Sequence, residues 1–197
     1  SPHKEIFATF GESDVNSGSI AVISQSGAML SALFDEYNSS GVGISTAFSL
    51  GNRVGIAEHN CLEYALNDDQ TKVIAIYLES VSDPQKLLNI LVSTKHKKPI
   101  FLLKGGTTEQ GRIAAISHTA ALATSEVLLS SLCHQAGIVQ VANFEQLVRA
   151  SIAASLSHYL PENVMIVTNA GGPAVVLTDE IASAGIPLHT LSPRTGA

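Results

Sequence analysis

Residues 18–28 read GSIAVISQSGA, and this stretch decides the fold class. A short apolar run leads directly into small residues and a glycine, after which a segment of helical period begins. An apolar run without polar alternation is typical of a strand in a parallel sheet whose two faces are both covered by helices. The stretch therefore predicts an α/β protein built from βαβ units.

The same unit repeats along the chain and predicts a complete sheet. Strands are expected at 20–24, 44–49, 72–78, 99–104 and 138–141. Helices are expected at 28–38, 57–67, 84–94, 119–135 and 144–157. Handedness and pairing rules for parallel strands favour the order 2-1-3-4-5, which gives a flavodoxin-like, doubly wound parallel sheet flanked by helices.

The chain of 197 residues is long enough for one full core and part of a second. Residues 1–17 are interpreted as an N-terminal linker and 18–161 as the first domain. Residues 162–197 restart the rhythm with a strand-like apolar run at 164–168, a Gly-Gly-Pro turn, a helix over 174–184 and a second strand-like run at 188–191. They predict the truncated start of a second flavodoxin-like domain, with exposed apolar surface, because such a fragment cannot cover both faces of its strands.

The composition excludes several classes of protein. Hydrophobic residues make up 45% of the chain and charged residues only 14%, which indicates apolar surface that a partner covers. The net charge of -6, without a basic cluster beyond residues 95–98, argues against nucleic-acid binding. Because no apolar run reaches about 18 residues and no basic segment precedes an apolar run, neither a membrane span nor a signal peptide is predicted.

Cysteine and histidine usage argues against disulfides and metal. Cys61 and Cys133 are too few for a disulfide framework or a CxxC metal site, and they suit a reducing cytoplasm. The histidines never occur at the i, i+4 spacing with a carboxylate that a helical zinc site uses, so no metal site is predicted.

Polar motifs follow the first four predicted strands, at residues 24–27, 51–52, 79–80 and 104–119. Open parallel sheets bind ligands outside the carboxyl ends of their strands. The four motifs are therefore expected to converge at one edge of the sheet.

Two of the glycine-containing turns suit an anion. Ser26 and Gly27 stand where a strand becomes a helix, so backbone N–H groups and the positive helix end can face a phosphoryl group. Gly171 and Gly172 repeat that geometry, and Pro173 suits the first turn of the helix that follows. The alternative is structural: small residues permit tight turns, and Ser26 caps its helix.

The segment after 99–104 is expected to be a long, glycine-bearing loop that carries His118. A histidine nitrogen is a nucleophile toward phosphorus near neutral pH, and a carboxylate on its other nitrogen fixes the tautomer. Glu79 closes a strand, where an acid needs a partner, and is the candidate for that role. The alternative for His118 is a histidine at a helix N-terminus that is satisfied by backbone, and the alternative for Glu79 is a solvated strand end.

Five motifs occur in an order that resembles one superfamily: GSIAVISQSGA at 18–28, YLE at 77–79, KGG at 104–106, GRIAAISHT at 111–119 and NAGGP at 169–173. They are similar to the NDP-forming acyl-CoA synthetases, which include ADP-forming acetyl-CoA synthetase and succinyl-CoA synthetase. The resemblance runs from about Phe7 to Leu191 and implies that 18–161 is the ligase domain with the phosphohistidine loop.

The resemblance implies that acyl-CoA and phosphate give acyl phosphate and CoA, and that the phosphoryl group passes through a histidine to ADP. The implied nucleophile is His118, oriented by Glu79. The implied phosphate-binding residues at two helix N-termini are Ser26, Gly27, Gly171 and Gly172. CoA or acyl-CoA and ADP or ATP with Mg²⁺ serve the complete enzyme, and none is expected to bind tightly to this chain alone. The implied partners are a CoA-binding Rossmann domain and an ATP-grasp domain, in an oligomer.

Two positions depart from the superfamily pattern, and two other functions stay open. In the superfamily, an acid often stands at the position of Gly55 and a glycine at the position of Thr124. The first departure puts a polar contact near the second strand in question, and the second reduces the flexibility of the histidine segment.

One alternative function is an acyl-CoA-sensing regulatory module of a protein lysine acyltransferase. The other is a non-catalytic flavodoxin-like assembly domain.

Overall fold

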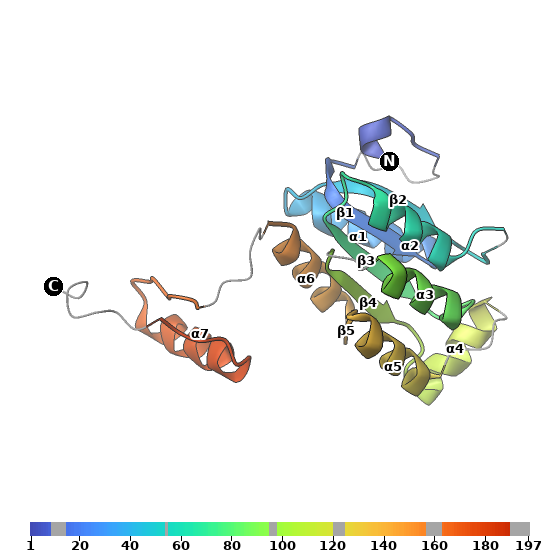
Figure 1. Cartoon of the computed structure of the whole chain (residues 1–197). Coiled ribbons are helices and arrows are strands. Elements are labelled where there is room, and N and C mark those ends of the chain that lie inside the picture. Colours follow the sequence, from blue (N-terminus) through green and yellow to red (C-terminus); the bar gives the residue numbers. More distant parts are fainter. Residues whose placement is uncertain (9–14, 54, 95–97, 120–124, 157–162, 190–197) are drawn as a thin grey trace. The chain divides into compact units, whose positions relative to one another are not determined.

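The computed structural model describes residues 1–8, 15–53, 55–94, 98–119, 125–156 and 163–189, with the backbone alone at 94 and 115–119. The chain divides into two compact units, Ser1–Leu156 and Ser157–Ala197 (Figure 1). The first unit begins with a short 3-10 helix, η1 (Pro2–Lys4), and the Ser1 hydroxyl donates to the carbonyl of Ser45 at 3.1 Å.

A parallel five-stranded sheet forms the centre of the first unit, in the order β2-β1-β3-β4-β5. The strands are β1 (Ser17–Ser24), β2 (Ile44–Ser49), β3 (Val73–Leu78), β4 (Ile100–Lys104) and β5 (Val139–Val141). The predicted strand order is confirmed. The carboxyl ends of all five strands therefore lie along one edge of the sheet.

Helices cover both faces of the sheet. They are α1 (Gly27–Ser39), α2 (Glu58–Asn67), α3 (Pro84–Thr94), α4 (Glu109–Thr119), α5 (Glu126–Ala136) and α6 (Phe144–Leu156). Buried residues of α2, α3 and α5 pack on one face and those of α1 and α6 on the other (Figure 1). The predicted doubly wound architecture is confirmed.

Strand β1 shows why the apolar run at residues 20–23 has no polar alternation. Ala21 and Ile23 belong to the cluster under α2, α3 and α5, whereas Ile20 and Val22 belong to the cluster under α1 and α6. All four side chains are fully buried. Because successive side chains of a strand point to opposite faces, a strand covered on both faces must be apolar at every position.

The loop expected after β4 is in fact largely a helix, α4, and the expectation was wrong in this respect. The Thr108 hydroxyl accepts the backbone N–H of Gly111 at 3.1 Å, which is an N-cap contact. Glu109 and Arg112 form an ion pair of 2.7 Å one turn apart. These local contacts start a helix, so His118 lies on helical backbone. The helix expected at 119–135 begins only at Glu126, and residues 120–124 lie outside the described part.

The second unit contains helix α7 (Gly171–Ser183) and one parallel bridge, Val164 to Leu188. Strands were expected at 164–168 and 188–191, but the first of these makes no more than that bridge, and 190–191 lie outside the described residues. A pair of strands without further neighbours is marginally stable, which explains the short pairing. As expected, the second unit exposes apolar side chains, among them Met165, Val167, Val175 and Val176.

We predict that Gly43→Ala destabilises the first unit by about 1 to 3 kcal/mol, because a Cβ there overpacks backbone that cannot move away. That Cβ would lie 2.2 Å from the carbonyl oxygen of Ser17, where the backbones of β1 and the segment before β2 meet. Gly27→Ala is the control, because its Cβ would have Ser49 Oγ at 3.8 Å as its nearest neighbour. Urea unfolding measures both changes, and equal stability of the two variants would contradict the prediction.

Candidate functional site

The N-terminus of α1 lies at the carboxyl end of β1. Ser26 has extended backbone, and its hydroxyl accepts the N–H of Met29 at 3.3 Å, so it is the N-cap of α1. The structural interpretation of Ser26 is therefore confirmed. The first N–H groups of a helix have no partner within the helix, and its dipole is positive at this end, so the same turn also suits an anion.

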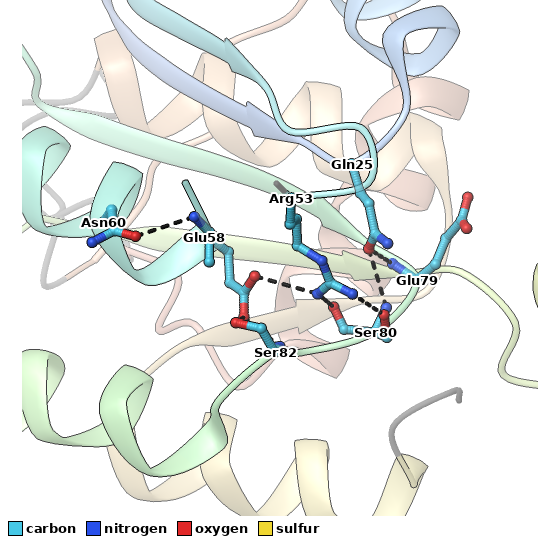
Figure 2. Close-up of polar contacts among 8 residues, drawn as sticks. Gln25, Arg53, Glu58, Asn60, Glu79, Ser80 and Ser82 are labelled. Atoms are coloured by element: carbon cyan, nitrogen blue, oxygen red, sulfur yellow. Dashed lines mark hydrogen bonds and ion pairs between the residues drawn. The ribbon is translucent and has the colours of Figure 1, made fainter. Parts of the chain in front are cut away.

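Gln25 ties the end of β1 to the residues that follow β3. Its backbone N–H donates to the carbonyl of Tyr77 at 3.0 Å, which extends the pairing of the two strands by one residue. Its side-chain oxygen Oε1 accepts the N–H of Glu79 at 2.9 Å and the N–H of Ser80 at 3.2 Å (Figure 2). With 5% of its surface exposed, Gln25 makes these contacts away from water, where lost partners are costly.

Arg53 ties the loop after β2 to the same segment. Its Nη1 donates to the Ser80 carbonyl at 2.8 Å and its Nη2 donates to the Ser80 hydroxyl at 2.7 Å (Figure 2). The planar guanidinium presents two donors in a fixed fork, which a lysine cannot reproduce. Arg53 itself has a φ of 57°, a left-handed conformation that is uncommon outside glycine. Arg53 therefore makes a polar contact from the loop after β2.

Glu58 completes this buried network. Its Oε2 lies 3.3 Å from Arg53 Nη1, and its Oε1 accepts the N–H and the hydroxyl of Ser82 at 2.6 and 2.7 Å (Figure 2). Burial alone would raise the pKa of Glu58, but hydrogen bonds from Ser82 and the backbone, together with the Arg53 charge, outweigh burial and lower it. Glu58 is therefore ionised in the folded protein near neutral pH.

Glu79 is buried at the end of β3, with 8% of its surface exposed. The Tyr77 hydroxyl donates to its Oε1 at 3.3 Å. Burial, followed by the charge of Glu79, raises the pKa of Tyr77 to about 12, so this hydroxyl keeps its proton. Gly105 fits tightly here, because a Cβ on it would lie 2.6 Å from Tyr77 Oη and 3.2 Å from Glu79 Cγ. The solvated strand end considered as an alternative is thus wrong for Glu79.

A lysine stands beside this carboxylate. Lys104 is 5% exposed, and its ammonium donates to the carbonyl of Gly105. Burial lowers the pKa of Lys104, whereas the charges of Glu126 and Glu79 act in the opposite direction. Lys104 pairs with Leu78 in the sheet, so the ends of β3 and β4 bring a buried lysine and a buried glutamate to the same edge.

The structure brings three of the candidate residues to one edge. Ser26 and Gly27 follow β1, Glu79 follows β3, and the Gln25 contacts join the two segments. His118 lies in the last turn of α4, and its side chain is outside the described part. Gly171 and Gly172 begin α7 in the second unit, where a Cβ on either would meet no atom within 4 Å. The meeting of Glu79 with His118, and the pairing of the two helix N-termini, stay predictions.

Sequence reasoning missed the residues that hold this edge. Gln25 and Lys104 lie inside motifs that were quoted, but their spacing says nothing of a contact to β3. Arg53 and Glu58 lie beside the Gly51-Asn52 motif, and an Arg and a Glu five residues apart carry no specific signal. The one usable sign is that Gln25, Arg53 and Lys104 lie at or just beyond the end of a predicted strand, where polar residues collect at the carboxyl edge.

The described residues offer few other centres of chemistry. Burial raises the pKa of the Cys61 and Cys133 thiols to about 11, so neither is a thiolate near neutral pH. In the part of the chain that the structure describes, no three His, Cys, Asp or Glu side chains are grouped to hold a metal ion. Within the same residues, no helix is long and apolar enough to cross a membrane.

Fold and edge together define a class: a flavodoxin-like domain whose polar groups collect at the carboxyl ends of parallel strands. Residues 17–154 match the family described as succinyl-CoA ligase like flavodoxin domain. The chain belongs to this family.

Its relatives include ADP-forming CoA ligases. The chain is 39% identical over 189 residues to a 4-hydroxybutyrate–CoA ligase [ADP-forming] of Nitrosopumilus maritimus, covering 94% of this chain and 27% of that protein. It is 36% identical to the alpha subunit of an acetate–CoA ligase [ADP-forming] I of Pyrococcus furiosus, covering 92% of this chain and 40% of the subunit. The chain therefore spans well under half the length of these relatives.

A solved structure agrees with this family. The dinucleotide-forming acetyl-coenzyme A synthetase 1 of Ca. Korarchaeum cryptofilum, in complex with phosphate and ADP, superposes with a TM-score of 0.84 at 35% identity. The match covers 94% of this chain and 40% of that one. The expected superfamily resemblance is confirmed.

We predict that Glu58→Gln destabilises the first unit by about 3 kcal/mol at pH 7, because Arg53 then keeps a buried charge without its partner. The folded pKa of Glu58 is lowered, so its charge stabilises the fold fully above its ordinary pKa of 4.5, and this contribution is lost as the pH falls through the lowered folded value. The stability difference between wild type and variant should therefore shrink below pH 4.5. Urea unfolding between pH 7 and pH 3 measures it.

The control for this prediction is Glu63→Gln, which changes an exposed glutamate on the same helix. It is expected to alter stability by less than about 0.5 kcal/mol at every pH. A stability difference for Glu58→Gln that is independent of pH would show that the ionised carboxylate is not what stabilises the network.

Proposed function

We propose that this chain is the phosphohistidine-bearing part of an NDP-forming acid–CoA ligase, which interconverts acyl-CoA, ADP and phosphate with carboxylic acid, ATP and CoA. The observation that carries the proposal is Glu79: a buried carboxylate, held by the segment that Gln25 and Arg53 fix, beside the N-terminus of α1. Family membership supports the reaction class, since the relatives are ADP-forming CoA ligases.

His118 is the proposed phosphoryl acceptor. Phosphate attacks the thioester carbonyl of acyl-CoA, the C–S bond breaks, and CoA leaves behind an acyl phosphate. An imidazole nitrogen of His118 then attacks phosphorus, and the bond to the acyl oxygen breaks to release the carboxylate. A terminal oxygen of ADP finally takes the phosphoryl group, and the P–N bond breaks to regenerate the imidazole.

The other candidate residues act by electrostatics. Glu79 accepts a hydrogen bond from the second ring nitrogen of His118 and stabilises positive charge that develops on the ring. Ser26 and Gly27 at α1, and Gly171 and Gly172 at α7, supply backbone N–H groups for the phosphoryl oxygens. Both helices have 13 residues, long enough for an appreciable dipole.

The complete reaction needs domains beyond this chain. We propose a CoA-binding Rossmann domain and an ATP-grasp nucleotide domain, in the same polypeptide or in a partner subunit of an oligomer. Mg²⁺ would accompany the nucleotide. The two cysteines are free and buried, which suits the reducing cytoplasm that we propose as the location.

We predict that His118→Asn abolishes phosphorylation of the chain. With active partner domains, ATP and Mg²⁺, the wild type should yield an acid-labile, base-stable phosphoprotein, and the variant none. Histidine and asparagine have similar helix propensities, so α4 should persist, as circular dichroism can check. His134→Asn, at an exposed histidine in the last turn of α5, is the matched control and should be labelled like the wild type.

Undiminished labelling of His118→Asn would place the phosphorylated residue elsewhere. An unlabelled wild type, in the presence of partners shown to be active, would overturn the ligase and favour the sensor or assembly domain.

We predict that Glu79→Gln lowers the rate of labelling by about 10- to 100-fold, since a hydrogen bond to a charged group contributes about 1.5 to 3 kcal/mol. The amide still accepts the Tyr77 hydroxyl but cannot stabilise positive charge on the imidazole. Rapid-quench measurement of phosphohistidine formation gives the rate. Glu36→Gln, at an exposed glutamate on α1, is the control, and a Glu79→Gln rate equal to that of the control would remove Glu79 from the mechanism.

A further inference from the structure

The backbone at Glu79 is fixed by a single side-chain atom. Gln25 Oε1 accepts the N–H of Glu79 at 2.9 Å and the N–H of Ser80 at 3.2 Å. These N–H groups belong to the two peptide planes on either side of the Glu79 Cα. Because both planes are tied to one oxygen, the φ and ψ angles of Glu79 are constrained, and so is the direction of its Cα–Cβ bond.

Ser80, the residue after Glu79, is also held at its carbonyl group. Arg53 binds the carbonyl and the hydroxyl of Ser80 at 2.8 and 2.7 Å. The backbone N–H of Ser80 thus contacts Gln25 while its carbonyl contacts Arg53. Arg53 is in turn held by Glu58, whose exposed fraction is 1%. Two side chains therefore hold the backbone of the segment after β3: Gln25, which follows β1, and Arg53, which follows β2. We call these contacts the brace.

The carboxylate end of Glu79 is confined by different contacts. Its Oε1 accepts the Tyr77 hydroxyl, and Gly105 leaves it just enough room at Cγ. Figure 2 shows the carboxylate pointing away from the guanidinium of Arg53, so the brace acts on the backbone and does not engage the acid. Glu79 is thus held at its backbone and at its carboxylate. These contacts therefore fix where the carboxylate lies, in addition to stabilising the loop.

We propose that Gln25 is a positioning residue for Glu79, with Arg53 as a second support, and that it acts on phosphoryl transfer only through the location of this carboxylate. The inference rests on the proposed function. A displacement of about 1 Å can reduce a reaction rate by about 100-fold, so a loosened brace has a measurable effect. If Gln25 only stabilised the fold, the effect of its substitution would not depend on whether Glu79 is present.

The test is a double-mutant cycle in the complete enzyme, with its CoA-binding and nucleotide-binding partners present. Gln25→Leu removes the acceptor of both N–H groups and should lower the single-turnover rate of His118 phosphorylation at saturating ATP about 10-fold, with the KM for ATP unchanged. In the Glu79→Gln background, the same substitution should lower the rate by about twofold or less. Gln25→Glu retains an oxygen acceptor and should restore most of the rate at pH 8.

Tyr37→Phe is the matched control for a lost buried contact. It removes the buried hydrogen bond of 2.7 Å between Tyr37 and Ser151, which joins α1 to α6. Its phosphorylation rate, measured at the same folded fraction, should equal that of the wild type. Ser80→Ala perturbs the brace more gently, because it removes the contact to Arg53 Nη2 and keeps the contact to Nη1.

The outcomes separate the two proposals. An unlabelled wild type overturns the proposed function. A labelled wild type in which Gln25→Leu has no effect, or loses as much rate with Gln at position 79 as with Glu, overturns the positioning role alone. Should Gln25→Leu fail to fold, Ser80→Ala decides: a loss of rate that disappears in the Glu79→Gln background supports the role, and no loss or an unchanged loss overturns it.

Discussion

The parallel pairing of β1 with β3 is the constraint on which the rest of the first unit depends. Ser24 lies opposite Tyr77 in the register, and the Gln25 N–H bond to the Tyr77 carbonyl extends the pairing past the end of the strand. Because β1 lies between β2 and β3 in the sheet, β2 pairs with it on its other side. Three loops are thereby brought to one edge, where the side chains of Gln25 and Arg53 reach the segment after β3.

Buried charge gives this edge its chemical character. Arg53 with Glu58, and Lys104 beside Glu79, place charged groups where little water reaches them. Desolvation makes such groups costly unless each has partners, and the partners here are backbone and side-chain groups of neighbouring loops. Preorganised charge of this kind acts strongly on charge that develops in a reaction, because no solvent has to reorganise around it.

The two units differ in how much they support themselves. The first has a sheet with apolar clusters on both faces, whereas α7 of the second has no buried residue. Relatives of greater length contain this whole region as a fraction of their chains. The second unit leaves apolar side chains such as Met165, Val167, Val175 and Val176 exposed, and its assignment as part of a second flavodoxin-like domain stays a prediction.

Sequence patterns alone predicted the sheet, the strand order and the edge at which the motifs gather, since two-face burial leaves strands apolar throughout and parallel connections obey a fixed hand. They also singled out Glu79 and the turn at Ser26. The helix α4, where a loop was expected, begins with local contacts of Thr108, Glu109 and Arg112 that the glycine-bearing motif obscured. Long-range packing, in contrast, was needed to show that Gln25 and Arg53 hold the segment bearing Glu79. Those contacts join residues 27 to 55 positions apart, and local patterns carry no information about which distant backbone group a buried side chain will meet.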